Sequence, residues 1–583
     1  MAEEPENNLN KERPESEEDM RLTEELPPEA GEIVLQIGKK VSVLLDTEDF
    51  SVVEKLVSRF DQYDGVGNLG KIELSVVRDL MNECLKGIDP GTVQNIEVLL
   101  PALLRGYVEN YDETTIGNIN HSLTVVSSMI EGLDKSDKLN KLNENGKVKE
   151  DYMGKTLEFP PDEWKLVGII AAVFHDAVKG NSVEFNAHGL KSADFVKQVK
   201  GILEKVGIVD HLAVKILGDP EKLAFIQDMI LYHMDEVPTF VPKLLMSAYM
   251  EAGKDREKVR NVVENIVGIS NEEIFKRVSN GLGKEEKEEL RQRVYKGDKK
   301  LREKALKEKV EKVLEVIEQA SDVQKVLENR TQNFKQNDFV LGGDLDAHFN
   351  FYNKKYPFVK KELEEVGVDS VYKILAPQRG GQEIADILIE ADTVGEYLNP
   401  TTGFAKLLTL NMWTNDYVVN NLGQGDIDKC FDSVLTSARD VYVELPKERK
   451  GVYREKFQKI TLIKTWFHAI KENYGITQKE LEEIKGLFNE DKGKMREKME
   501  ELYTEKVREM LQDFSRLSLD EVCESIGYVR DMKGKWQQIP AFAEVVSATK
   551  DSSVFLEVLN DRYDDNLDRF KMKICTFVNE EDS

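Results

Sequence analysis

Apolar residues recur at steps of three and four along most of the chain, which is the spacing of amphipathic helices. Within residues 31–110 the clearest runs are Val52, Val53, Leu56, Val57 and Phe60, and later Val93, Ile96, Leu99 and Leu100. Pro101 directly follows the second run and is expected to break that helix locally. The alternation that marks strands is scarce in residues 111–240, so the pattern predicts an all-α fold.

The same pattern divides the chain into segments. Residues 1–30 are rich in Glu, Asn and Pro and predict a disordered acidic tail, either solvated or bound to a partner. A helical lead-in over 31–110 precedes a core over 111–240, and a second core-like stretch covers 375–429. The remainder, 430–583, predicts a charged C-terminal helical domain with no catalytic cluster.

The intervening segment, residues 241–374, is highly charged and includes the run Lys284-Glu-Glu-Lys-Glu-Glu-Leu-Arg. A narrow apolar stripe continues through it at Val310, Val313, Leu314 and Ile317. This combination predicts long solvated helices, arranged as a hairpin and inserted into the core. We interpret them as a spacer, and docking of a protein partner or of a second copy is the alternative.

Composition narrows the function classes. The formal net charge of -28 argues against non-specific nucleic-acid binding, which depends on a basic surface. A nucleotide substrate stays compatible, because a bound metal ion reverses the local sign of charge. The four cysteines are far apart and form no CxxC pair, which is typical of a reducing compartment. Without a signal-peptide pattern or an apolar run of about 18 residues, we expect a cytoplasmic protein with no membrane insertion.

Histidine and aspartate residues occur on apolar helical faces. The run Ala171-Ala-Val-Phe-His-Asp-Ala-Val-Lys179 ends an apolar segment in adjacent His175 and Asp176. His121 shares a helical face with Val125, four residues later. Burying an imidazole beside a carboxylate is costly unless each has a partner, and a metal ion uses both as ligands.

Two further segments repeat the arrangement. His233 follows Ile230 at a helical step of three, and Asp392 follows Leu388 at a step of four. Taken singly, each has an ordinary explanation, since a buried histidine is usually hydrogen-bonded and an aspartate can cap a helix or pair with arginine. Together, these groups are easier to satisfy around a metal ion than by hydrogen bonds alone.

These positions resemble the H…HD…D pattern of the HD-domain superfamily of metal-dependent phosphohydrolases. His121, the pair His175-Asp176, and Asp392 match the pattern. The run His175-Asp-Ala-Val-Lys179 is similar to the signature His-Asp-x-Gly-Lys, with Val178 in place of the glycine. The resemblance implies an HD-domain helical core whose metal ligands lie on successive helices.

The resemblance covers about residues 111–240 and 375–425, which implies a core in two parts with the charged segment between them. The run Phe185-Asn-Ala-His188-Gly is similar to the family segment in which a histidine precedes a helix start. With His233, it implies the two-metal branch of the superfamily, in which Asp176 bridges the ions. The implied ligand sets are His121, His175 and Asp392 for one ion and His188 and His233 for the other. Such ligands suit one or two divalent transition-metal ions, namely Mn, Fe, Zn, Ni or Co, with Mg also allowed.

Several assignments have rivals. Asp322 is the alternative closing ligand, and we prefer Asp392 because its flanks are more apolar and Gly395 fits the family segment. Lys179 matches the signature lysine and contacts either a phosphate or a carboxylate. Arg379, in a Gly-rich loop, is either a phosphate clamp or, in our preferred interpretation, an ordinary loop residue. The remaining histidines, interpreted as structural or surface residues, are His211, His348 and His468.

The implied function is hydrolysis of a small phosphoester, such as a nucleotide, by a metal-dependent phosphohydrolase or phosphodiesterase. Asp176 and Lys179 are the expected catalytic residues. Two close metal ions suit this reaction, because they lower the pKa of a bound water and neutralise the phosphoryl oxygens. Two alternatives stay open: a di-iron oxygenase similar to inositol oxygenase, with the same six ligands, and a non-catalytic regulatory or scaffold protein.

Overall fold

The computed structural model describes most of the central part of the chain. The described residues are 74–109, 115–140, 142, 146–179, 187–233, 255–320, 368–375, 382–401, 447–502 and 506–538, with single positions at 245, 249 and 253 and several between 431 and 445. Outside them lie the predicted tail over 1–30, the run from Val52 to Phe60, and the residues Asp322, His348 and Arg379.

Helices dominate the described residues, which confirms the all-α prediction. The first helices are α3 (Leu74–Cys84), α4 (Pro90–Glu109), α5 (Thr115–Asp134), α6 (Asp137–Asn140), α7 (Pro161–Phe174), α8 (Ala187–Lys205), α9 (Leu212–Gly218) and α10 (Pro220–Tyr232). The charged segment contains α12 (Arg256–Ile266), α13 (Asn271–Val278), α14 (Lys284–Tyr295), α15 (Lys299–Ala320) and α19 (Val368–Leu375), and α20 (Glu383–Tyr397) follows it. The C-terminal part contains α24 (Lys447–Thr461), α25 (Ile463–Ile470), the 3-10 helix η6 (Lys471–Tyr474), α26 (Gln478–Glu490), α27 (Lys492–Leu502), α28 (Arg508–Arg516), α29 (Leu519–Ser525) and the hairpin of β3 (Tyr528–Arg530) and β4 (Trp536–Gln538). None of the described helices is long and apolar enough to cross a bilayer.

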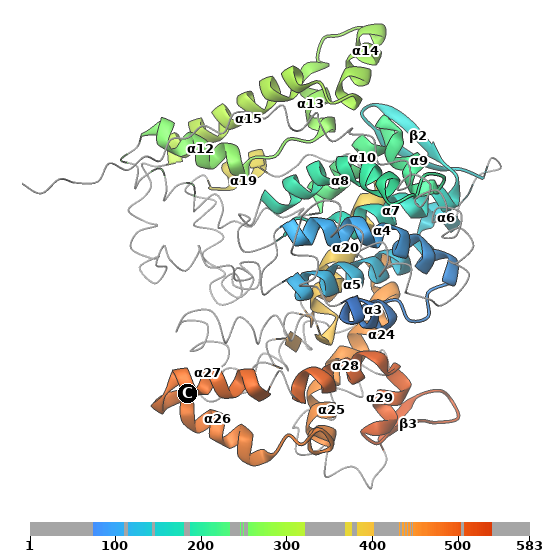
Figure 1. Cartoon of the computed structure of the whole chain (residues 1–583), viewed down its shortest axis with the longest axis vertical. Coiled ribbons are helices and arrows are strands. Elements are labelled where there is room, and N and C mark those ends of the chain that lie inside the picture. The colour runs from blue at the N-terminus through green and yellow to red at the C-terminus, as the bar shows by residue number, and fades with distance from the viewer. Residues whose placement is uncertain are drawn as a thin grey trace, which may run out of the picture.

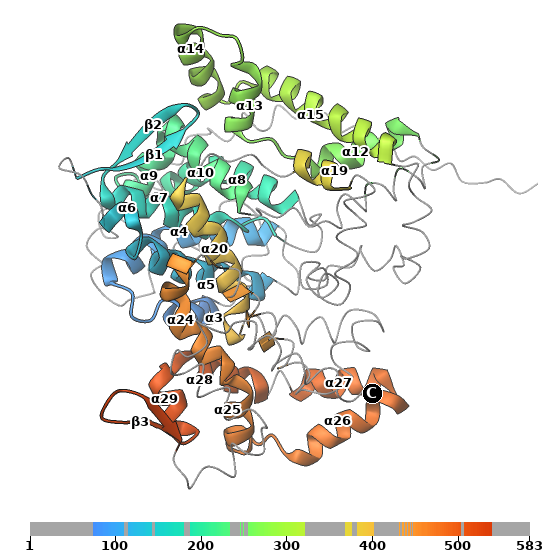
Figure 2. The ribbon, with the colours of Figure 1, turned by 180° about the vertical axis from the view of Figure 1, so that it is seen from behind.

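Most of the described helices contribute to one of two hydrophobic cores. The first gathers side chains of α3 to α10, of α13 to α15 and of the first half of α20. The second begins at Val394, in the second half of α20, and continues through α24 to α29. Figures 1 and 2 show these two assemblies one above the other, with α20 directed from the upper toward the lower. α20 therefore belongs to both cores, and the domain boundaries drawn from the sequence stay predictions.

The structure corrects the expectation for Pro101. α4 runs unbroken from Pro90 to Glu109 with the proline inside it. The apolar residues on both sides of Pro101 are buried in the first core, namely Leu99, Leu100, Leu103 and Leu104. A proline inside a helix costs about 3 kcal/mol, and burial of each leucine contributes about 1.5–3 kcal/mol. Packing therefore outweighs the lost backbone hydrogen bond, and the helix continues.

A β-hairpin interrupts the helices in a segment whose sequence has little of the alternation that marks strands. β1 (Val148–Tyr152) and β2 (Lys155–Phe159) pair antiparallel, and the turn residues Met153 and Gly154 both have positive φ, as in a type I′ turn. The central inward residue of β1 is Glu150, which is fully buried and accepts hydrogen bonds from Trp164 Nε1 and Lys138 Nζ. This buried carboxylate breaks the apolar alternation by which a strand is recognised.

The charged segment folds through internal ion pairs. Arg256 of α12 bonds to Glu311 at 2.6 Å and to Glu318 at 2.7 Å, both on α15. Lys309 is buried, and its Nζ donates to Oε2 of Glu273 at 2.9 Å. The helices predicted for this segment are present, and their charges pair with one another as well as with solvent.

A carboxyl group on α10 holds the start of α13. Oδ1 of Asp228 accepts from the backbone N–H of Asn271, and Oδ2 accepts from that of Glu272, both at 2.9 Å. The hydroxyl of Tyr152 donates to Oδ2 at 2.8 Å and also lies 3.1 Å from the carbonyl oxygen of Ala224.

We expect the carboxyl group of Asp228 to make the protein less stable as pH rises from about 4 to about 7. Burial raises the pKa of Asp228 from 3.8 to about 7, so the folded state retains a proton that the unfolded state releases. The contribution of Asp228 to the free energy of unfolding is therefore complete below the pKa of the unfolded state. It is lost as pH rises to the pKa of the folded state, at about 1.4 kcal/mol per pH unit and roughly 4 kcal/mol in total. Urea denaturation at about pH 5 and about pH 8 should show a smaller loss for Asp228→Asn than for the wild type. Equal losses would contradict the assignment.

Candidate metal centre

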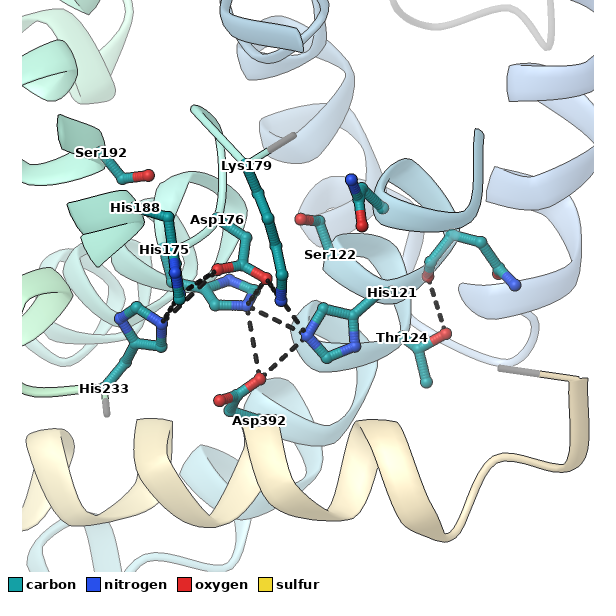
Figure 3. A network of polar contacts seen from close by, with 12 residues as sticks. His121, Ser122, Thr124, His175, Asp176, Lys179, His188, Ser192, His233 and Asp392 are labelled. Carbon is teal, nitrogen blue, oxygen red and sulfur yellow. Dashed lines mark hydrogen bonds and ion pairs between the residues drawn. The ribbon is translucent and has the colours of Figure 1, made fainter. Parts of the chain in front are cut away.

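The six predicted ligands converge within the first core (Figure 3). They come from five helices that are distant in sequence but packed together, so the fold alone brings them into contact. The positions are His121 on α5, His175 and Asp176 directly after α7, His188 at the start of α8, His233 directly after α10 and Asp392 in the middle of α20.

Two of the imidazoles are oriented in the same way at helix ends. Nδ1 of His175 donates to the carbonyl oxygen of Ala172 at 2.7 Å, and Nδ1 of His233 donates to that of Ile230 at 2.5 Å. Each bond uses a carbonyl group near the C-terminus of its helix, where carbonyl groups have no N–H partner within the helix. The bond fixes the tautomer, so Nε2 of each neutral ring presents a lone pair to the centre.

His121, His175 and Asp392 form one group. Oδ1 of Asp392 lies 2.9 Å from Nε2 of His121 and 3.4 Å from Nε2 of His175, and the two nitrogens are 3.4 Å apart. Ligand atoms that each lie about 2.0–2.2 Å from a metal ion are separated from one another by roughly 2.8–3.6 Å. The three atoms already have the spacing of ligands to one ion.

Asp176, His188 and His233 form the second group. Oδ1 of Asp176 lies 3.1 Å from Nε2 of His188 and 3.5 Å from Nε2 of His233, and these nitrogens are 3.3 Å apart. The other oxygen, Oδ2, lies 3.6 Å from Nε2 of both His121 and His175. Asp176 therefore faces both groups, each with a different oxygen.

Asp176 also shows that the centre suits a cation. Its side chain is 1% exposed, and Oδ1 is buried without a hydrogen-bond donor among the described residues. Leaving such an oxygen unsatisfied costs about 1–3 kcal/mol or more, which a metal ion would offset. Four imidazole nitrogens and two carboxylates are a donor set typical of divalent transition metals. Within the described part of the chain, these are the two groups with metal-ligand spacing.

Burial favours the neutral, metal-binding form of two of the imidazoles, those of His121 and His188. Burial lowers the pKa of His121 to about 4, against the opposing effect of Asp392, and burial also lowers the pKa of His188. Burial acts in the same direction on His175, but the carboxylates of Asp176 and Asp392 outweigh it and raise the pKa of that ring. The field that attracts a proton to His175 equally attracts a metal cation.

Lys179 places a positive charge beside the metal ligands. Its Nζ donates to Oδ2 of Asp176 at 2.7 Å, as Figure 3 shows. Burial opposes the charge, but the carboxylates of Asp176, Glu396 and Asp392 raise the pKa of Lys179 above its usual value. In return, Lys179 helps to keep the pKa of Asp176 well below its usual range despite burial.

The centre is more open on one side than on the other. The side chains of Lys179 and Asp392 are 28% and 22% exposed, whereas the other five ligands are at most 8% exposed. A ligand from solvent therefore meets the group of His121, His175 and Asp392 first.

The turn after Asp176 does not need the glycine that the signature His-Asp-x-Gly-Lys has at the position of Val178. Among the described non-glycine residues only Met153 has a positive φ, so Val178 has an ordinary backbone conformation. Its N–H donates to Oγ of Ser192 at 3.2 Å, which anchors the turn to α8. Sequence reasoning missed Ser192, because no periodicity distinguishes a serine that accepts a backbone hydrogen bond.

A glycine on α4, Gly106, allows that helix to pack closely against the turn after Asp176. A Cβ on Gly106 would lie 2.6 Å from the carbonyl oxygen of Ala177, the residue after Asp176, and 3.1 Å from a ring carbon of Phe195. The first distance is too short for any real contact, so α4 approaches the turn closely only because this residue is glycine. The sequence offered no sign of this contact.

Gly106→Ala is expected to displace the turn that carries Asp176, to weaken metal binding and to destabilise the protein by about 1–3 kcal/mol. Isothermal titration with Mn²⁺ and thermal unfolding measure the two effects. The matched control is Gly201→Ala on α8, where an added Cβ would meet nothing within 4 Å. The control should bind metal as the wild type does, and identical behaviour of the two variants would refute the support role.

The two other described histidines lie outside the centre. Nδ1 of His211 accepts from the N–H of Ala213 at the start of α9, and Nδ1 of His468 lies 3.3 Å from Nζ of Lys471. Both positions agree with the structural or surface roles expected for them.

No protein-family model, no curated protein and no solved structure matches the chain.

Proposed function

We propose that the chain is a metal-dependent phosphohydrolase or phosphodiesterase of the HD-domain superfamily, acting on a small phosphoester such as a nucleotide. The observation that carries this proposal is the position of Asp176, whose two oxygens face two different groups of histidines. A carboxylate shared in this way is typical of a two-metal site. The proposed ions are divalent transition metals, Mn, Fe, Zn, Ni or Co, with Mg also allowed.

When bound, two such ions would lower the pKa of water and neutralise the charge that develops on phosphoryl oxygens. The residues of the chain supply the rest. The helix-end carbonyls orient His175 and His233, and the low exposure of the ligands keeps bulk water away from the second group. Lys179 places an ammonium group on the open side, where it suits an anionic substrate. This charge favours a phosphoester over an uncharged substrate of an oxygenase.

The proposal is tested by a substrate screen on the full chain, loaded in turn with each of the six metals. The probes are p-nitrophenyl phosphate, bis(p-nitrophenyl) phosphate and a set of nucleotides, assayed with and without dioxygen. We expect turnover that persists anaerobically, disappears in His175→Ala and remains in His211→Asn, which preserves a side chain able to cap α9. Absence of any phosphoester turnover would overturn the proposal, and metal-dependent dioxygen consumption would point instead to the oxygenase alternative.

A further inference from the structure

α20 joins the metal centre to the C-terminal part of the chain. The buried apolar residues of α20 up to Ala391 belong to the first core, and those from Val394 onward belong to the second. Asp392 lies at the changeover between them. In Figures 1 and 2, α24 lies beside the C-terminal part of α20 and near α3 and α5. Asp392 is thus placed where the two hydrophobic cores meet.

An arginine of α24 bonds directly to α20, two residues before Asp392. Nε of Arg449 donates to Oε2 of Glu390 at 2.8 Å, and the two side chains are only 10% and 14% exposed. Glu390 precedes Asp392 by two residues on the same helix. Charge-assisted hydrogen bonds of low exposure are among the stronger polar contacts. Because residues two apart point to different faces of a helix, Arg449 can act on Asp392 only through the backbone of α20.

Further polar contacts join α24 to α5, which carries a ligand of the same group. Nζ of Lys456 lies 2.9 Å from Oε2 of Glu131 and donates to Oγ of Ser128 at 3.1 Å. The hydroxyl of Tyr453 lies 3.1 Å from where a Cβ on Gly132 would be, so the two helices approach closely there. Interfaces rich in polar contacts are typical of parts that move relative to each other more readily than a fused core does.

The second ligand group is built differently. Asp176, His188 and His233 come from the ends of α7, α8 and α10, whose buried apolar side chains, apart from Tyr232, belong to the first core. Their placement is therefore expected to be independent of how the C-terminal part packs.

We propose that the C-terminal part of the chain positions Asp392 through Arg449, and so sets the affinity for the ion bound by His121, His175 and Asp392. This inference rests on the proposed metal site and gives the C-terminal helices a role in it. Arg449 is a positioning residue, because it acts on the ion only through α20.

The test is a Co²⁺ titration of the full chain, followed by visible absorption and by calorimetry. The wild type should show two binding steps, and His121→Ala and His233→Ala identify which step belongs to which group. Arg449→Met should weaken the step lost in His121→Ala by about 10–100-fold and leave the other unchanged. Arg449→Lys, which retains the charge, should recover most of the affinity.

Arg256→Met is the matched control, since Arg256 also forms ion pairs but bonds to α15. It should leave both steps unchanged. If Arg449→Met leaves both steps at wild-type affinity, or weakens both equally while lowering the melting temperature, Arg449 is only a structural residue and the inference is overturned. Absence of Co²⁺ binding by the wild type would overturn the proposed metal site as well.

Discussion

Asp176→Asn is expected to abolish the binding of both metal ions, although it changes a single side chain. Oδ1 faces His188 and His233 while Oδ2 faces His121 and His175, so the carboxylate serves both groups. An amide keeps the shape but carries no charge and offers one oxygen. The loss in affinity should exceed the 10–100-fold typical of removing an outer-shell partner. Calorimetric titration with Mn²⁺ and metal analysis after dialysis measure it.

Single-group variants provide the contrast for this experiment. His233→Ala should lose one ion and retain the other, and His121→Ala should do the same for the opposite group. Circular dichroism serves to check that Asp176→Asn is folded, because the substitution leaves Lys179 without its carboxylate partner. If Asp176→Asn retained one ion at wild-type affinity, Asp176 would not be the shared ligand.

Lys179→Met is expected to lower kcat/KM for the phosphoester found in the screen by about 10²–10³-fold, while leaving the metal content unchanged. The Lys179 ammonium lies at the more exposed side of the centre, where a phosphoryl group would enter. Methionine keeps most of the side-chain volume but removes the charge. Steady-state kinetics at saturating metal measure the effect, and Lys197→Met, an exposed lysine on α8, is the control.

The same experiment separates the two roles that the sequence allowed for Lys179. If the lysine only pairs with the carboxylate of Asp176, the methionine variant should change metal affinity and retain its kcat/KM at saturating metal. If it contacts the phosphoryl group, the catalytic constant falls and the metal content does not. An unchanged kcat/KM would therefore contradict a catalytic role.

The inward orientation of the ligand residues could be predicted, because it depends on local helical spacing. Val125 near His121 and Leu388 near Asp392 mark the buried face of each helix, and both residues are fully buried in the first core. A run of apolar residues that ends in His175 and Asp176 likewise indicates burial before any tertiary contact is known. The helical period alone does not predict which of these residues lie close together, because their contacts depend on the packing of five helices.

Features that depend on distant contacts were not visible in the sequence. Pro101 is tolerated because leucines on both sides of it pack in the core, and Glu150 is buried because Trp164 and Lys138 donate to it. The close approach at Gly106 joins α4 to the turn after α7, and Arg449 reaches α20 from another core. Each is a pairing between segments with no shared local pattern.

Metal analysis of the purified full chain tests the central claim most directly. The protein is purified both aerobically and anaerobically, loaded with a divalent transition metal and freed of excess, and its metal content is then measured by mass spectrometry. The six-ligand arrangement predicts about two ions per chain, falling to about one in His233→Ala. Less than one ion per wild-type chain under both conditions would contradict the two-metal site and the hydrolytic function proposed from it.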